Sequence, residues 1–150
     1  MDDLAHIPGF LFLDHIAIAV KPGQLEEQVR AYRSLGFEEI HREDMLGSDQ
    51  VREVLLRVGD GPNLVQLLEP LSPESPVAKQ LERNGGRGGL AHLAFRVTDI
   101  HKAFEHMKAS GFNLIDAAPR GGSRGTTVFF VHPKSLGYLM EVVQEGDAHA

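Results

Sequence analysis

The sequence contains nearly the same strand-like stretch twice. "LDHIAIAV" occupies residues 13–20 and "LAHLAFRV" occupies residues 90–97. Each stretch has a histidine in its third position, and these histidines, His15 and His92, are 77 residues apart in the chain. A repeat of this kind in a chain of 150 residues predicts two similar modules that share one core.

The segments that follow the two histidine stretches also resemble each other. The first is followed by a helical pattern of apolar residues over 24–35, which Gly36 ends in the manner of a left-handed cap. The second is followed by Asp99, a suitable N-cap, and by a helical pattern that ends at Gly111. Both halves therefore predict a strand followed by a helix.

In both halves the helical pattern is followed by a run that opens the next strand, "LGFEEI" (35–40) in the first half and "SGFNLI" (110–115) in the second. Two further apolar runs in each half predict strands, because they are rich in β-branched and aromatic residues and are separated by Gly and Pro. They are "VREVLLRV" (51–58) and "NLVQLLE" (63–69) in the first half, and "TTVFFVH" (126–132) and "YLMEVVQ" (138–144) in the second.

The order of these elements predicts an α+β fold of two tandem βαβββ modules. The first module covers about residues 11–70, the second about residues 89–145, and residues 71–88 form the linker. We expect the modules to pack side by side in one domain of residues 1–150. They would then form a curved mixed sheet with its helices outside and a concave face suited to a site.

Composition excludes several classes of protein. Lys and Arg number 15 against 21 Asp and Glu, a formal net charge of −6, which argues against a nucleic-acid partner. The chain has no cysteine, so it has neither disulfides nor thiolate metal sites, and a cytoplasmic location is expected. No apolar run approaches the roughly 20 residues of a membrane span, so no membrane partner is expected.

Four polar residues occupy equivalent places in the two halves. Side chains alternate along a strand, so His15 and His92 should each share a face with small residues such as alanine. Aligning "NLVQLL" with "YLMEVV" superimposes Gln66 on Glu141, which follow their histidines by 51 and 49 residues. Pseudo-twofold packing of the modules would bring all four side chains together.

Two imidazoles, an amide oxygen and a carboxylate suit one divalent ion such as Zn, Co, Ni, Mn or Fe(II). A single histidine in a strand is more often a hydrogen-bonded core residue than a ligand. The repeat favours the metal, because four buried polar groups would each cost free energy without a partner and one ion would satisfy them all. The predicted metal ligands are His15, Gln66, His92 and Glu141.

The chain resembles the vicinal oxygen chelate superfamily (glyoxalase, bleomycin resistance protein and dioxygenase) and, within it, the methylmalonyl-CoA epimerases. The resemblance rests on "LDHIAIAV", "LVQLLEPLSPESPVAKQL", "GGLAHLAFRV" and "VFFVHPKSLGYLMEVV". It implies a single domain around a metal held by the four residues above. It also implies an isomerase that epimerises a 2-methylmalonyl-CoA-like thioester, and a homodimer.

Epimerisation requires removal of the α-proton from one side and its return on the other, hence two acid/base groups. In the family these are two glutamates, of which the resemblance places the ligand glutamate on Glu141. We expect the second just before the third strand, where this chain reads "GSDQV" (47–51). The glutamate position then falls on Ser48, and Asp49 is the neighbouring carboxylate.

Candidate substrate contacts lie in "RGGSRGTT" (120–127) and in the "HPK" turn. Ser123, Arg120 and Arg124 could bind a substrate carboxylate, and Lys134 could meet the phosphates of CoA. The alternative for the loop is a flexible hairpin with solvated arginines. The run "FEEIHRED" (37–44) is interpreted as a solvated strand and loop.

Three other functions remain open on the sequence alone. A glyoxalase I-like lactoylglutathione lyase would use similar proton transfer on a glutathione adduct. A ring-cleaving Fe(II) dioxygenase would use His15, His92 and Glu141 as a facial triad. A metal-free protein that sequesters a small molecule would need no convergent ligands at all.

Overall fold

The computed structural model describes residues 8–146, which form two compact units. His15–Ala91 form one, which we call the central unit, and the chain up to Asp14 joins the chain from His92 onward in the other, the terminal unit. The boundaries fall inside β1 (Phe10–Ala19) and β5 (Gly89–Val97), so each unit contains part of both strands.

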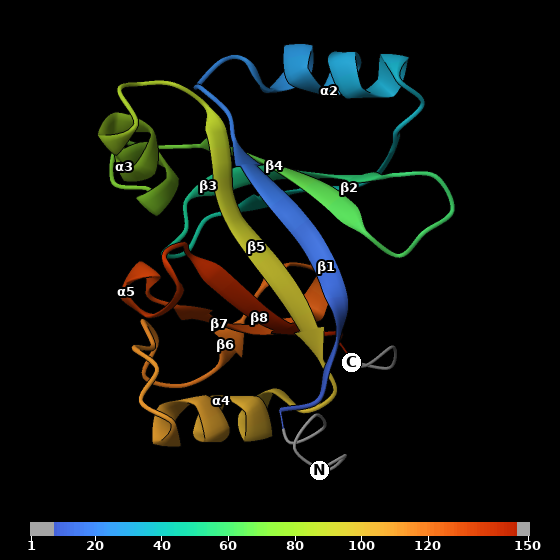
Figure 1. The fold of residues 1–150 in the computed structure, drawn as a ribbon. Coiled ribbons are helices and arrows are strands. Elements are labelled where there is room, and N and C mark those ends of the chain that lie inside the picture. The colour runs from blue at the N-terminus through green and yellow to red at the C-terminus, as the bar shows by residue number, and fades with distance from the viewer. Residues whose placement is uncertain (1–7, 147–150) are drawn as a thin grey trace. The chain divides into compact units, whose positions relative to one another are not determined.

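The central unit has the strand order β2-β3-β4-β1 (Figure 1). It comprises the second half of β1, α2 (Leu25–Ser34), β2 (Glu38–Met45), β3 (Val51–Arg57), β4 (Leu64–Pro70), α3 (Pro76–Arg83) and the start of β5. β1 pairs with β4 in parallel, and β3 is antiparallel to both β2 and β4. This is the βαβββ order that the first half of the sequence predicts.

One face of this sheet is covered by α2. Leu25 and Val29 of the helix pack against Val54 of β3, Leu67 of β4 and Val20, the residue after β1. The helix ends where the sequence predicts, because Gly36 follows it with a φ of +96°, in the left-handed region that glycine adopts most readily.

The opposite face of the central unit carries His15, and we call it the histidine face. In the strand register His15 lies opposite Leu64 and Ala17 opposite Gln66, so these side chains share a face. α3 covers its apolar end, where Val77 and Leu81 contact a cluster that contains Ala17. The prediction that His15 shares its face with Ala17 is confirmed, and the neighbour opposite His15 on that face is Leu64.

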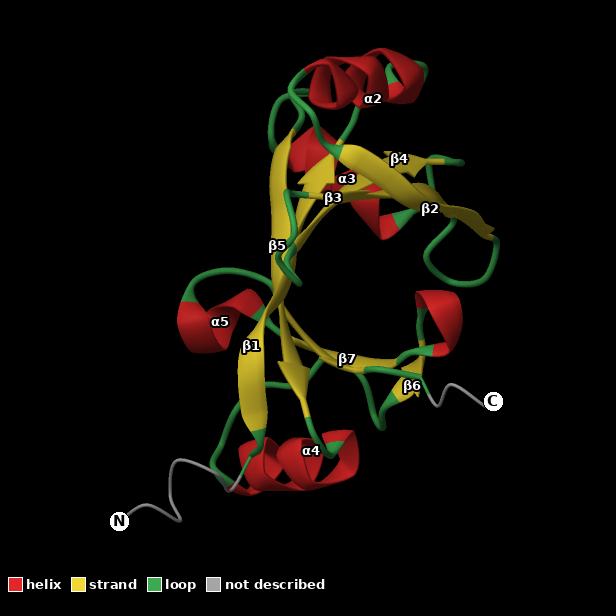
Figure 2. Ribbon diagram, turned by 90° about the vertical axis from the view of Figure 1, so that its right-hand side faces the viewer, coloured by secondary structure: helices red, strands yellow, loops and turns green. Residues whose placement is uncertain are grey.

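The terminal unit has the strand order β5-β8-β7-β6, and all four strands are labelled in Figure 1. It comprises the start of β1, most of β5, α4 (Ile100–Ala109), β6 (Arg120–Gly121), a 3-10 turn (Ser123–Gly125), β7 (Thr127–Val131), α5 (Pro133–Leu136) and β8 (Met140–Gln144). Figure 2 shows one helix of this unit, α4, in a view turned by 90°. Asp99 caps α4 as predicted, since its carboxylate accepts hydrogen bonds from the backbone N–H groups of His101 and Lys102, both at 3.1 Å.

The α4 helix covers one face of the terminal unit through Phe104 and Met107. The other face is again a histidine face. Ala94 lies opposite Glu141, and Glu141 lies opposite Phe130, so these residues point to the side from which His92 projects. Ala94, Val128 and Val143 form a small apolar floor there.

One predicted strand is wrong. Residues 110–115 form only an isolated bridge, between Leu114 and Val131. The physical reason lies in the next residue: the Asp116 carboxylate accepts a hydrogen bond from the backbone N–H of Phe130 at 2.7 Å, where a continuing strand would have placed a carbonyl. The side chain therefore ends the pairing that the apolar pattern favoured.

The linker forms a helix of its own, α3, whose N-cap is Ser75. Among the residues that the structure describes, no helix is both long and apolar enough to cross a bilayer. The α+β fold class is confirmed.

Candidate metal and acid–base site

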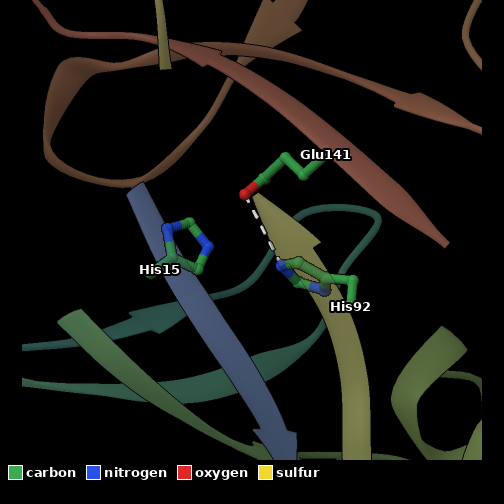
Figure 3. Close-up of side chains that lie close together, drawn as sticks. All are labelled: His15, His92 and Glu141. Atoms are coloured by element: carbon green, nitrogen blue, oxygen red, sulfur yellow. Dashed lines mark ion pairs between the residues drawn. The ribbon is translucent and has the colours of Figure 1, made fainter. Parts of the chain in front are cut away.

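In the terminal unit, His92 and Glu141 lie beside each other on the histidine face (Figure 3). The imidazole Nε2 is 3.5 Å from the carboxylate Oε1, and both side chains are nearly buried. β5 and β8, which carry them, are neighbouring parallel strands, so the backbone fixes their approach. Of the four predicted ligands, these are the two that this unit contains.

A ring and a guanidinium extend this group. The ring of Phe130 meets that of His92 edge-on, at 5.3 Å between ring centres, and the Arg120 guanidinium lies 5.5 Å from the centre of the Phe130 ring. Asp116 holds Arg120 in place by accepting a hydrogen bond from its Nε at 3.0 Å. A positive group is therefore built onto the face that carries His92 and Glu141.

In the central unit, His15 and Gln66 lie on the histidine face and are both buried. Figure 3 shows His15 projecting from β1. The amide Nε2 of Gln66 donates a hydrogen bond to Oε1 of Glu53 at 2.8 Å. This bond fixes the orientation of the amide, because only its nitrogen can donate.

Glu53 is a buried carboxylate beside a predicted ligand, and the sequence interpretation did not single it out. It lies in β3 with no exposed surface, and the register places it diagonally across from Gln66 on the same face. A fully buried carboxylate is costly unless it is hydrogen-bonded. The signal in the sequence was the single acid in "VREVLL", which alternation assigns to the same side as Val51 and Leu55.

The donor atoms fit a divalent ion. Oε1 of Gln66 is buried and has no hydrogen-bond donor among residues 8–146, so an unsatisfied acceptor points away from Glu53. For His92 and Glu141, ligand bonds of about 2.1 Å would separate two ligands of one ion by about 3.0–3.4 Å, which is close to their observed 3.5 Å. Imidazole, amide and carboxylate groups together suit Zn, Co, Mn or Ni.

Ser48 and Asp49, the two residues expected to replace the second glutamate, do not lie on β3 or β4, the strands that carry Glu53 and Gln66. Ser48 is exposed and Asp49 half-buried, in the loop between β2 and β3. The Asp49 carbonyl accepts a hydrogen bond from Oγ of Ser75 at 2.8 Å, which ties this loop to the start of α3. Neither residue is part of the β-ladder that aligns Glu53 with Gln66.

The 120–127 loop is an ordered hairpin. Gly122 and Thr126 are joined by a backbone hydrogen bond of 2.8 Å, and both the backbone N–H and the hydroxyl of Thr126 donate to the Ser123 carbonyl. A Cβ on Gly122 would lie 2.7 Å from Oγ1 of Thr126 and 2.8 Å from a methyl carbon of Val128, so a larger residue there would force these side chains to shift. Ser123 is half-buried, whereas Arg124 and, in the "HPK" turn, Lys134 are exposed.

The sequence profile of the Glyoxalase/Bleomycin resistance protein/Dioxygenase superfamily matches residues 14–130. The chain is 33% identical over 135 residues to the ethylmalonyl-CoA/methylmalonyl-CoA epimerase of Cereibacter sphaeroides, an alignment that covers 88% of this chain and 96% of the relative.

The chain belongs to the methylmalonyl-CoA epimerase family.

Solved structures of this family resemble the whole fold. The crystal structure of methylmalonyl-CoA epimerase from Mycobacterium tuberculosis has a TM-score of 0.85 and 32% identity, and the match covers 93% of this chain and 92% of the other. A Streptomyces coelicolor methylmalonyl-CoA epimerase variant in complex with 2-nitronate-propionyl-CoA has a TM-score of 0.85 and 33% identity, with 93% and 100% covered. The resemblance to methylmalonyl-CoA epimerases that the sequence indicates is therefore confirmed.

Proposed function

We propose that this protein is a metal-dependent epimerase of 2-methylmalonyl-CoA or a similar acyl-CoA. One observation carries the proposal: each unit places a buried carboxylate beside a predicted metal ligand, Glu53 at Gln66 and Glu141 at His92. Epimerisation at a carbon acid needs two acid/base groups, and these two units supply one each. Family membership supports the same reaction.

The proposed metal ligands are His15, Gln66, His92 and Glu141. The unsatisfied amide oxygen of Gln66 and the close pair of His92 and Glu141 support this assignment. When bound, a divalent ion would act as a Lewis acid toward the thioester oxygen and so favour the enolate. The amide ligand is neutral, so one carboxylate would leave the site a net positive charge, consistent with that role.

The proton steps belong to the side chains. In one direction Glu53 takes the α-proton: the C–H bond breaks, an O–H bond forms on Glu53, and the electron pair passes into the enolate. Glu141 then gives its proton to the α-carbon, and the thioester carbonyl re-forms. The reverse reaction exchanges the two roles. We propose Glu53 as the second acid/base; Asp49 and Ser48 are the alternatives that the sequence predicts.

Arg120 is proposed to bind the free carboxylate of the substrate. Asp116 and the Phe130 ring hold its guanidinium, so little conformational entropy is lost on binding. The variant Arg120→Leu should raise KM about tenfold or more, as expected for the loss of a charged hydrogen bond, with a smaller change in kcat. Ser123, Arg124 and Lys134 are proposed as further substrate contacts, and a cytoplasmic homodimer is proposed by family membership.

The decisive test follows deuterium from solvent into the α-position of methylmalonyl-CoA. The purified protein should catalyse the exchange, lose it on treatment with a chelator and regain it with Co, Zn, Mn or Ni. Deuterium entry that ignores the chelator would contradict the metal assignment. Turnover of a lactoylglutathione adduct, or oxygen uptake with a catechol, in place of exchange would contradict the epimerase.

A further inference from the structure

Beside Glu53, on the histidine face of the central unit, lies a second polar group that the proposed reaction does not use. His41 and Glu43 of β2 project from the same side of the sheet, and Glu43 lies directly opposite Glu53 in the antiparallel register. Nε2 of His41 is 2.8 Å from Oε1 of Glu43. One ligand-type atom from each of the three residues lies within 4.8 Å of the others.

Their exposure increases from Glu53 outward. Glu53 has no exposed surface, whereas the side chains of His41 and Glu43 are 29% and 37% exposed. Along β2 the residues alternate between exposed and half-buried, and His41 and Glu43 belong to the half-buried row. The run interpreted as a solvated strand and loop is largely the strand β2, in which none of the residues 38–44 is buried and every second one is half-buried.

The proposed reaction leaves the enzyme with a proton to move. After one epimerisation Glu53 carries the proton it removed, and Glu141 has lost the proton it gave. A second turnover in the same direction requires Glu53 to release its proton and Glu141 to regain one. Glu53 has no exposed surface, so its proton needs a route to water.

We propose that Glu43 and His41 are this route, an inference that rests on the proposed epimerase function. The proton leaves the Glu53 carboxyl for the Glu43 carboxylate, across a separation that one bridging water can span. Glu43 passes it to Nε2 of the His41 tautomer that carries its hydrogen on Nδ1, and the imidazolium then releases the Nδ1 proton to water. Before the next cycle the ring loses its Nε2 proton to solvent and takes one from solvent on Nδ1, which restores the accepting tautomer. Each step breaks one bond to hydrogen and forms another, so no oxidant or co-reactant is needed.

The experiment measures α-proton exchange for each epimer separately. The 2R and 2S thioesters are incubated in deuterated water, and deuterium in the recovered substrate is followed by mass spectrometry. Glu53→Gln first shows which epimer Glu53 deprotonates, because that epimer should stop exchanging. His41→Gln keeps a group that can hydrogen-bond to Glu43 but cannot carry a proton, so it should slow exchange of the same epimer about tenfold or more.

The other epimer is the internal control, because its exchange should stay at the wild-type rate in His41→Gln and thereby show that the variant is folded. Arg42→Gln, on the opposite side of the same strand, should leave both epimers unchanged. Added imidazole should restore exchange to His41→Gln.

The results that would refute the epimerase function differ from those that would refute only the proton route. A wild-type enzyme that exchanges neither epimer refutes the epimerase function, and the route falls with it. An active wild type together with a His41→Gln variant that exchanges both epimers at wild-type rates refutes the route alone. Equal slowing of both epimers also refutes it, because a defect specific to Glu53 cannot act on the side of Glu141.

Discussion

Replacing Glu53 by glutamine separates its chemical role from its structural one. The amide oxygen of a glutamine can still accept the hydrogen bond that Gln66 donates to Glu53 at 2.8 Å, so the buried pair stays satisfied. The change removes the charge from this bond, which should cost about 1 kcal/mol of folding free energy. Loss of a positioned base should lower the epimerisation rate by about 10²–10⁴-fold.

Alanine at the same position should behave differently. Glu53→Ala leaves the buried Nε2 of Gln66 without its acceptor, which costs about 1–3 kcal/mol. Thermal unfolding followed by circular dichroism should therefore show a midpoint roughly 3–10 °C lower. The glutamine variant should unfold close to the wild type and yet be inactive, and this contrast identifies the carboxylate as chemical rather than structural.

Asp49→Asn and Ser48→Ala are the matched controls, because both residues lie in the loop that precedes β3. Epimerisation is followed with a coupled assay that consumes only one epimer, at saturating thioester and metal. Both controls should retain the wild-type rate. An inactive Asp49→Asn beside an active Glu53→Gln would refute the assignment and return the second acid/base to the position that the sequence predicts.

Three further outcomes follow from the same structure. Glu141→Gln should weaken metal binding about 10-fold or more, measured by titration with Co, because it removes the charged ligand. Gln66→Glu places a second carboxylate beside that of Glu53 and should lower stability by about 1–3 kcal/mol. Adding Glu53→Gln should restore the stability, because the amide at position 53 can then donate a hydrogen bond to the carboxylate at position 66. The pKa of Glu26 is lowered from 4.5 by its hydrogen bond to Arg42, so this pair stabilises the fold above that pH and loses its effect as the pH falls. Arg42→Gln should therefore cost up to about 1 kcal/mol at pH 7, and thermal melts should show the difference shrinking in acid.

Much of the fold could be predicted because the pattern of each element is local. The alternation in "LDHIAIAV" places His15 with Ala17, and the structure confirms this face. Helix ends were predictable where the end depends on one residue, as at Asp99 and Gly36. The false strand at 110–115 arose because Asp116 acts on Phe130, a contact between residues that are distant in sequence.

The site was predictable only in part, for the same reason. The repeat relates His15 to His92 and Gln66 to Glu141, because equivalent positions can be compared without knowing the pairing of strands. The second half has no acidic residue at the position equivalent to Glu53. When "VREVLL" is aligned with "TTVFFV", Glu53 corresponds to Val128. Its importance appears only when β3 and β4 are paired and the diagonal contact with Gln66 is known.

The difference between Gln66 and Glu141 has a physical explanation in this pairing. A ligand at position 66 must offer an oxygen on one side and, on the other, a donor to the buried Glu53, and among the common side chains of that length only the amide has both. At position 141 the strand across is β7, which presents Phe130, so no buried acceptor requires a donor there and a carboxylate is compatible with its surroundings. In the proposed mechanism the terminal unit therefore combines the ligand and acid/base roles in one residue, Glu141, whereas the central unit divides them between Gln66 and Glu53. On this reasoning position 66 carries a neutral amide because Glu53 is the second acid/base. A variant that keeps the activity and replaces one of these two residues should therefore also replace the other.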